Sequence, residues 1–234
     1  MMHKALIGFD INEYPEIEIF QKYFECDFCE YNEDYFIKNI SKYTILVPHL
    51  YLDLSSKLIG QANNLKYLFT PSTGTNHIDL QSVKENDINF YCLSDNADFI
   101  SEISSTAELA WLLILSANRK IIPLNRRVIS ENSWKNNDIR GNQLKNKTIG
   151  IIGFGRLGKM VYEYAKSFDM NILIYDIDEN SVLGFENHVI DFDGLIKSSD
   201  VITLHPKLNE TSFEMINRRS IKLMKDGVII INTS

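Results

Sequence analysis

Residues 148–176 read TIGIIGFGRLGKMVYEYAKSFDMNILIYD, and this stretch decides how the second half of the chain folds. An apolar run at residues 148–152 predicts a buried strand, and the glycine-rich turn after it opens a helix. In the turn, Gly153 permits the tight bend, Gly155 lets the backbone approach a diphosphate, and Gly158 lets the helix pack closely on the strand. The free N–H groups and the positive end of the helix would face the phosphates.

A second predicted strand at residues 171–175 ends at Asp176, at the distance expected for a carboxylate that accepts hydrogen bonds from the adenosine ribose. Asp176 would repel a 2′-phosphate, and no arginine follows it at Ile177 or Asp178, so the pattern favours NAD over NADP. Glycines alone are weak evidence. Strand, turn, helix, strand and terminal acid in this order predict a dinucleotide-binding βαβ unit, and the alternative is a tight turn without a ligand.

The remainder of the chain predicts two α/β domains, because short β-rich runs alternate with amphipathic stretches. Such alternation implies mostly parallel sheets covered by helices on both faces. In the first part the expected strands are residues 5–9, 44–47, 67–70 and 88–93, and the expected helices are 16–24, 54–62 and 80–85. In the second part the expected strands are 148–152, 171–175, 201–204 and 228–231, and the expected helices are 105–119 and 157–168.

Composition and charge narrow the class of protein. The 234 residues are 44% hydrophobic with a net charge of -7, and residues 1–104 hold 7 Lys and no Arg against 16 Asp and Glu. This acidic part argues against nucleic-acid binding. The N-terminus does not resemble a signal peptide, the uninterrupted apolar run at residues 109–115 is too short to span a bilayer, and three cysteines suit a reducing compartment. We therefore expect a cytoplasmic protein with no membrane partner.

Residues 105–119 form the longest apolar helical pattern in the chain. Its start offers Ser105 and Thr106 as caps and Glu108 as an acid in the first turn. The pattern is apolar on almost every face, which favours packing between domains or between two copies of the chain over ligand binding. We expect the domain boundary at the start of this helix, after residue 104.

Several segments in the same order resemble the D-isomer-specific 2-hydroxyacid dehydrogenase family, from about residue 65 onward. The first of them, residues 72–79, looks especially like the corresponding loop of phosphoglycerate dehydrogenases. The segments are STGTNHID at 72–79, STAE at 105–108 with its helix, Trp134, the glycine-rich unit, DVITLH at 200–205 and GVIIINTS at 227–234. The resemblance implies a flavodoxin-like substrate domain at residues 1–104 and an incomplete Rossmann NAD-binding domain, a doubly wound parallel sheet, at residues 105–234.

The resemblance also implies an activity and its site residues. The activity is NAD-dependent interconversion of a small 2-oxo acid and its D-2-hydroxy acid, in a homodimer formed through the region of residues 106–119. Thr73 and Gly74 would offer backbone N–H groups to the substrate carboxylate, next to Asn76. The implied cofactor contacts, beyond the glycine-rich unit and Asp176, are Thr106 near the cofactor, Arg156 and Leu157 over the diphosphate, His205 and Pro206 on the adenosine side, and Thr233 and Ser234 near the nicotinamide ribose.

The catalytic arginine, glutamate and histidine of the family pattern would follow Ser234, so no catalytic residue of that set is assigned here. We therefore expect the chain to be C-terminally truncated. One alternative is a non-catalytic NAD-binding sensor or interaction module derived from the same fold. A third interpretation is another NAD enzyme, such as a hydrolase that uses NAD transiently, but the loop at residues 72–79 counts against it.

Other candidate site residues have simpler interpretations. His205 ends a predicted strand, where it resembles a cofactor contact more than an acid–base catalyst, and His77 suits a solvent-facing turn. Cys26 and Cys29 have the spacing of half a metal or redox site, but nothing in the sequence completes it, so packing is favoured. The acidic run at residues 27–34 lacks calcium-loop spacing. No metal site is predicted.

Overall fold

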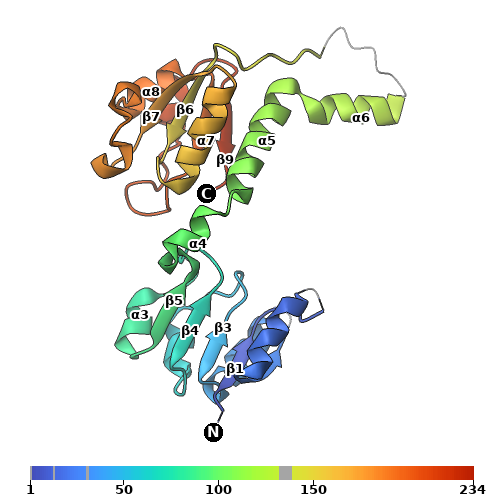
Figure 1. The fold of residues 1–234 in the computed structure, drawn as a ribbon, viewed down its shortest axis with the longest axis vertical. Helices are drawn as coiled ribbons and strands as arrows, with labels where there is room; N and C mark the ends of the chain where they lie inside the picture. The colour runs from blue at the N-terminus through green and yellow to red at the C-terminus, as the bar shows by residue number, and fades with distance from the viewer. Residues whose placement is uncertain (1, 13, 30–31, 132–138) are drawn as a thin grey trace. The chain divides into compact units, whose positions relative to one another are not determined.

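The structure is a computed structural model that describes residues 2–12, 14–29, 32–131 and 139–234. Trp134, one of the residues that carry the family resemblance, lies outside the described residues. The chain divides into two compact units, Met1–Ile100 and Ser101–Ser234, whereas the sequence predicted a boundary after residue 104. Met1–Ile100 is called the first unit and Ser101–Ser234 the second unit (Figure 1).

The first unit contains a five-stranded parallel sheet in the order β2-β1-β3-β4-β5. This is the flavodoxin-like order. The predicted parallel α/β fold is therefore confirmed for this unit. The strands are β1 (Lys4–Ile7), β2 (Glu25–Phe28), β3 (Ile45–Val47), β4 (Tyr67–Thr70) and β5 (Asn89–Cys92).

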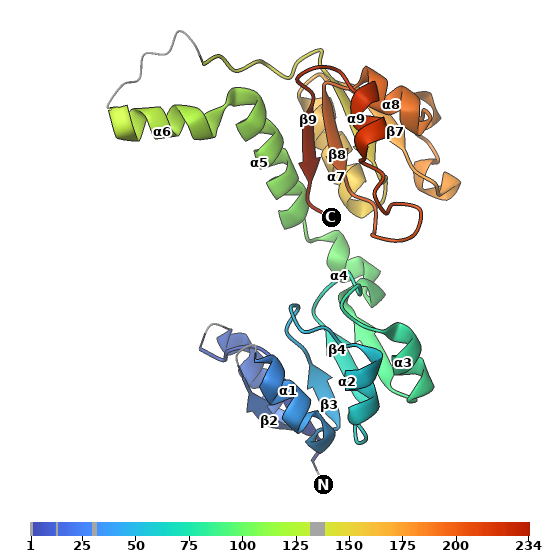
Figure 2. The same cartoon turned by 180° about the vertical axis from the view of Figure 1, so that it is seen from behind.

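The two faces of this sheet are covered unequally. Alternate strand residues point to opposite faces, so Leu6 packs with the helices α1, α2 and α3, visible together in Figure 2, whereas Ile7 packs beneath the 3₁₀ helix η1. The sequence predicted helices on both faces without this asymmetry. The helical elements are η1 (Pro15–Lys22), α1 (Glu33–Asn39), η2 (Ile40–Lys42), α2 (Ser56–Gln61), α3 (Leu80–Glu85), η3 (Leu93–Asp95) and α4 (Ala97–Ser101).

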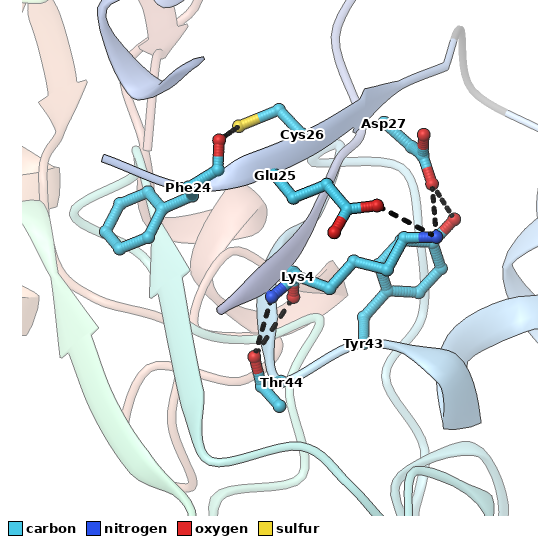
Figure 3. Close-up of polar contacts among 7 residues, drawn as sticks. All are labelled: Lys4, Phe24, Glu25, Cys26, Asp27, Tyr43 and Thr44. Atoms are coloured by element: carbon cyan, nitrogen blue, oxygen red, sulfur yellow. Dashed lines mark hydrogen bonds and ion pairs between the residues drawn. The ribbon is translucent and has the colours of Figure 1, made fainter. Parts of the chain in front are cut away.

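The edge strand β2 was not predicted, because its sequence is largely polar and merges with the acidic run. Side chains of neighbouring elements hold it in place (Figure 3). The Lys4 ammonium lies 3.8 Å from the Glu25 carboxylate and 3.4 Å from that of Asp27. The Tyr43 hydroxyl donates a hydrogen bond of 2.6 Å to Asp27, and this bond and Lys4 hold the pKa of the Asp27 carboxyl below its usual range. A strand that the sequence pattern did not predict is thus held against the sheet by long-range contacts.

Cys26 lies in β2 and Cys29 follows its last residue, and the two side chains lie on opposite sides of the sheet. Cys26 packs with the cluster around Ile7, and Cys29 packs with the cluster around Leu6. Burial raises the pKa of the Cys29 thiol to about 11, so it is protonated and unreactive at neutral pH. Both are free thiols, as packing cysteines would be, and no group of three potential ligands for a metal ion occurs within the described residues.

The second unit contains a four-stranded parallel sheet in the order β7-β6-β8-β9. A parallel bridge from Ile174 to Val189 adds a one-residue position outside β7. Numbered along the chain, β6 is 1, β7 is 2, the Val189 bridge is 3, β8 is 4 and β9 is 5. The spatial order is then 3-2-1-4-5, which is the Rossmann order. The strands are β6 (Thr148–Ile152), β7 (Asn171–Tyr175), β8 (Val201–Leu204) and β9 (Ile229–Asn232).

Helices pack on both faces of this second sheet, which confirms the predicted doubly wound arrangement. Ile151 faces α5 and α7, and Ile152 faces α8 and α9. The short helices α8 and α9 were not predicted, although α3, which is about as short, was. The elements are α5 (Ser105–Arg119), α6 (Ile121–Glu131), α7 (Arg156–Ser167), η4 (Glu179–Val182), η5 (Glu186–His188), α8 (Phe192–Ser198) and α9 (Arg218–Leu223).

Helix α5 buries one stripe only, although its sequence is apolar on almost every face. Ala107, Ala110, Trp111 and Ile114 follow helical spacing into the core of the second unit, while the opposite face is exposed. By length and composition alone, Ala97–Arg119, which comprises α4 and α5, could cross a membrane, whereas the prediction considered only its uninterrupted apolar run. A core helix of a soluble protein passes the same test when it is mostly buried, whereas 17% of this stretch is buried, along the stripe of α5 that packs on the second unit.

Candidate functional site

The glycine-rich turn lies at the carboxyl end of β6, where Gly153 is required for two reasons. Its φ of +85° is in the left-handed region, which glycine adopts without strain. A Cβ atom at this position would also lie 2.5 Å from the Pro206 nitrogen and 2.7 Å from the His205 carbonyl carbon. The turn therefore touches the segment that leaves β8, and the structure brings together two predicted parts of the cofactor site.

The other two glycines of the turn have different surroundings. A Cβ atom at Gly158 would lie 2.2 Å from the Gly153 carbonyl oxygen, so α7 can close onto the turn only with glycine there. Nothing lies within 4 Å of the corresponding position at Gly155, the N-cap residue immediately before α7. The first N–H groups of a helix have no partner inside it. This open approach to a helix N-terminus fits the diphosphate of a dinucleotide.

Asp176 follows β7 and is tied directly to the turn. Its Oδ2 accepts a hydrogen bond of 2.5 Å from the Phe154 N–H, and its Oδ1 accepts one of 2.8 Å from the Asp178 N–H. A carboxylate has about four acceptor positions, so about two remain for the hydroxyls of a ribose. The geometry therefore fits the predicted role of Asp176 in binding the adenosine ribose.

A cage of aromatic rings supports the turn from inside the second unit. Phe154 is fully buried, and its ring meets Tyr162 and Phe185 edge to face at centroid distances of 5.8 and 4.8 Å. His188 Nδ1 lies 3.2 Å from the Ile172 carbonyl oxygen, and His188 Nε2 lies 3.3 Å from the Tyr162 hydroxyl. Because a carbonyl oxygen only accepts, Nδ1 carries the proton and Nε2 accepts from Tyr162.

The sequence pattern revealed neither this cage nor a partner for His188. The available signal was the aromatic residue between the first two glycines, because that position points from the turn into the core. The ring of Phe154 anchors the same residue whose N–H holds Asp176. The cage therefore connects the core of the second unit to both halves of the nucleotide site.

Arg156 and Thr106 lie where the first turns of α5 and α7 meet. The Arg156 guanidinium donates a hydrogen bond to the Ile103 carbonyl oxygen, immediately before α5. Thr106 is half-buried in the first turn of α5, and Leu157 is half-buried in the first turn of α7. In this structure the Arg156 side chain is thus directed at the start of α5, while its remaining donors can still serve an anion.

His205 follows β8 and is suited to remain neutral. Its Nε2 lies 2.9 Å from the Thr203 hydroxyl, and burial lowers its pKa to about 4. Among the described residues, two buried polar side-chain atoms have no hydrogen-bond partner, His205 Nδ1 and the Thr233 hydroxyl. Such atoms are uncommon in folded proteins and suggest an absent ligand or water. Both belong to the predicted cofactor contacts, and neighbouring Ser234 donates through its hydroxyl to the Asn232 side chain at 2.8 Å.

The predicted carboxylate-binding loop, residues 72–76, follows β4 in the first unit. The Ser72 hydroxyl donates to the Gly74 carbonyl oxygen at 2.6 Å and lies 2.9 Å from the Thr70 hydroxyl. In the part of the chain that the structure describes, the N–H groups of Thr73 and Gly74 donate to no protein acceptor. The loop, including Asn76, is largely exposed. It therefore presents two backbone donors that could hold a carboxylate.

His77 is half-buried and contacts the residues that support this loop, whereas the sequence suggested that it faces solvent. Its Nε2 lies 3.5 Å from the Thr70 hydroxyl, and its carbonyl oxygen accepts from the Leu54 N–H. Burial lowers the pKa of the His77 imidazole, and the charge of Asp53 opposes that shift. His77 is thus a half-buried part of the loop's support.

Comparison with known proteins covers both units. Residues 111–234 match the family model described as D-isomer specific 2-hydroxyacid dehydrogenase, NAD binding domain, and residues 8–165 match the catalytic domain of the same family. Hydroxypyruvate reductase of Thermotoga maritima is 35% identical over 204 residues, which are 86% of this chain and 64% of that protein. Aromatic 2-oxoacid reductase of Clostridium sporogenes is 37% identical over 171 residues, 73% of this chain and 50% of that protein.

Among solved structures, D-lactate dehydrogenase from Aquifex aeolicus, complexed with NAD and lactic acid, matches with a TM-score of 0.82 at 28% identity. The match covers 99% of this chain and 68% of that one. The chain thus spans about half to two thirds of the length of these two curated relatives.

Proposed function

Because the chain belongs to the D-isomer-specific 2-hydroxyacid dehydrogenase family, we propose that it takes part in NAD-dependent interconversion of a small 2-oxo acid and its D-2-hydroxy acid. The second unit contains the family's NAD-binding domain. The observation that carries the proposal is the joint geometry of the open Gly155 approach and Asp176, which the Phe154 N–H holds beside it. NAD, when bound, supplies the hydride acceptor or donor.

Residues of the second unit bind the cofactor, and residues of the first unit bind the acid. The first amides of α7 hold the diphosphate, and the Asp176 carboxylate accepts from the ribose hydroxyls. In the first unit, the N–H groups of Thr73 and Gly74 bind the acid's carboxylate. A pKa of about 4 leaves His205 almost wholly unprotonated at neutral pH, which makes it a poor general acid and a weak general base there. Its role is to contact the cofactor.

Calorimetry with NADH and NADPH tests the cofactor assignment. We expect NADH to bind, NADPH to bind at least about 10-fold more weakly because of the charge on Asp176, and Asp176→Gly to remove most of that difference. Assays of NADH oxidation with hydroxypyruvate, pyruvate and glyoxylate then test the reaction. NADH binding without turnover would favour the alternative, an NAD-binding sensor or interaction module, and absence of NADH binding would overturn both.

We also propose that two copies associate through the exposed face of α5. Leu109 and Leu112 on that face are 48% and 59% exposed in the single chain, next to Leu113. Exposed apolar patches on soluble proteins commonly mark protein interfaces. Leu112→Glu should convert a dimer to a monomer in a mass measurement in solution. We propose separately that the protein is cytoplasmic and has no nucleic-acid or membrane partner. The free cysteines of the described residues suit a reducing compartment.

A further inference from the structure

Thr203 is a polar residue in the buried strand β8. Its side chain is fully buried, and the other three residues of the strand are apolar. The sheet register places Thr203 beside Ile151 of β6 and Ile231 of β9, and both of these belong to the apolar core that packs against α5 and α7. A hydroxyl buried among apolar side chains lowers stability unless it finds a hydrogen-bond partner. The choice of threonine here therefore depends on what its hydroxyl contacts.

That contact is His205, which follows the end of β8. Alternate residues of a strand point to the same face, so the side chains of Thr203 and His205 lie on one side of the sheet. The Thr203 hydroxyl lies 2.9 Å from His205 Nε2, and it has no other hydrogen-bond partner in the part of the chain that the structure describes. Valine would fill the same space without a hydroxyl, so the structural reason for threonine at this position is the histidine.

The direction of this hydrogen bond follows from a count of protons. Burial lowers the pKa of His205 to about 4, so at neutral pH the ring carries a single proton, on Nδ1 or on Nε2. If Nε2 carried it and donated to Thr203, both the hydroxyl proton and His205 Nδ1 would lack a partner among the described residues. If Nδ1 carries it, Thr203 donates to Nε2 and only the Nδ1 N–H lacks a partner. The second arrangement leaves fewer buried groups unpaired and is favoured.

The unpaired N–H belongs to the carboxyl edge of the sheet, next to the dinucleotide turn. The His205 N–H donates to the Ile152 carbonyl oxygen at 2.8 Å, and one further step of the register places Gly153 on one side of His205 and Thr233 on the other. A Cβ atom at Gly153 would lie 2.7 Å from the His205 carbonyl carbon. Among the described residues, the Thr233 hydroxyl is the other buried side-chain atom without a partner. Two unpaired polar groups thus come from neighbouring strands at the edge that receives the cofactor.

We propose that Thr203 is a positioning residue for the cofactor site, which fixes the proton of the neutral His205 ring on Nδ1 and so makes that nitrogen a hydrogen-bond donor to an acceptor atom of the bound dinucleotide. Thr203 acts through His205. This inference rests on the proposed function, because the same dinucleotide occupies the turn at Gly153. One hydrogen bond of ordinary net strength corresponds to about a 2- to 12-fold change in affinity.

The first test measures the protonated nitrogen directly, on the full chain without cofactor. Proton–nitrogen correlation spectra of protein with ¹⁵N-labelled histidine distinguish a protonated ring nitrogen from an unprotonated one at neutral pH. Loss of signals in His205→Gln assigns those of His205 among the five histidines. We expect the proton on Nδ1 in the wild-type chain. Thr203→Val, which removes the donor and keeps the shape, should place part of it on Nε2, and Thr203→Ser should restore the wild-type spectrum.

Calorimetry with NADH tests the second step, from the histidine to the ligand. Thr203→Val should weaken NADH binding about 5-fold, within the range of one hydrogen bond, and Thr203→Ser should bind NADH like the wild-type chain. Ser199→Ala is the matched control. Ser199 is equally buried in the second unit, but its hydroxyl donates to the Leu195 carbonyl oxygen at 2.7 Å instead of to a histidine. This variant should change neither the His205 signals nor the affinity.

The outcomes separate this inference from the proposed function. A wild-type proton on Nε2, an unchanged spectrum in Thr203→Val, or full NADH affinity in Thr203→Val would each overturn the role of Thr203, and NADH binding by the wild-type chain would leave the proposed function standing. If the wild-type chain binds no NADH, the proposed function fails, and the donor role of His205 fails with it. An equal loss of affinity in Ser199→Ala would indicate a general loss of structure and would also overturn the role of Thr203.

Discussion

The two units each present a glycine-containing loop at the carboxyl edge of a parallel sheet, and the loops are held in different ways. In the second unit, Gly153 and Gly158 lie where a Cβ atom would collide with backbone atoms. In the first unit, nothing lies within 4 Å of a Cβ atom at Gly74, and side-chain hydroxyls of Thr70 and Ser72 shape the loop. The dinucleotide turn is determined by sterics, and the carboxylate loop by hydrogen bonds.

The aromatic residues of the two edges show the same contrast. Phe154 is fully buried under the dinucleotide turn, where it supports the backbone. Tyr51 follows β3 in the first unit and is largely exposed, and its ring centroid lies 4.7 Å from that of His49. Residues of one chemical type are therefore a buried support in one unit and surface residues in the other.

The largest difference between the loops is expected on adding a single methyl group. Gly158→Ala places a Cβ atom against the Gly153 carbonyl oxygen and should lower the free energy of unfolding of the second unit by about 3 kcal/mol. Gly74→Ala should change that of the first unit by about 0.5 kcal/mol or less. Urea unfolding measures both, since the chain's two tryptophans belong to residues 101–234 and report on the second unit, whereas circular dichroism reports on both units and gives the first unit by difference. Equal effects would contradict the comparison.

A smaller effect is expected at Gly155, where space is open for a ligand. Gly155→Ala should weaken NADH binding about 30-fold, which corresponds to about 2 kcal/mol, because the methyl group obstructs the approach of the diphosphate. The free energy of unfolding should fall by about 0.5–1 kcal/mol, because glycine is preferred over alanine at a helix N-cap. Calorimetry and urea unfolding of the same variant separate the two. Unchanged affinity would remove Gly155 from the cofactor site.

The next effect concerns the histidines near the two edges. Burial lowers the pKa of His205 to about 4, so between pH 6.5 and 4 the unfolded chain binds a proton that the folded chain does not. The stability of the second unit should therefore fall as pH falls, by about 1–2 kcal/mol between pH 7 and 5. His205→Gln should flatten this dependence in tryptophan-monitored unfolding. His77→Gln, in the first unit, should leave it unchanged, and a flattened profile there would argue against the assignment.

The smallest effect is expected from the aromatic cage. Tyr162→Phe removes the hydroxyl that His188 accepts from and should lower the stability of the second unit by about 1 kcal/mol. Because the cage positions Phe154 and, through its N–H, Asp176, NADH affinity should fall about 3-fold. Tyr164→Phe, on the next part of the same helix, is the matched control. If both variants bind NADH equally well, the cage supports the fold without positioning the site.

Local patterns predicted the elements that have strong periods or clear breaks. The predicted bounds of β4, α3, α5, β6, β7 and β8 agree with the structure residue for residue. Some of the missed elements depend on distant partners or are short, and α6 is neither. β2 is polar and is held by Lys4 and Tyr43, whereas α6 follows the left-handed Lys120 and contains Pro123 in its first turn, where a proline does not break a helix.

The sequence by itself determined the βαβ unit, the preference for NAD and the family, because glycines in a tight turn and a carboxylate at a strand end meet local steric and electrostatic demands. Only the tertiary structure decided that Phe154 rests in a ring cage, that His205 is buried and neutral, and that Gly8 brings Phe9 and His49 together. These features depend on contacts between residues far apart in the chain, which no local pattern encodes.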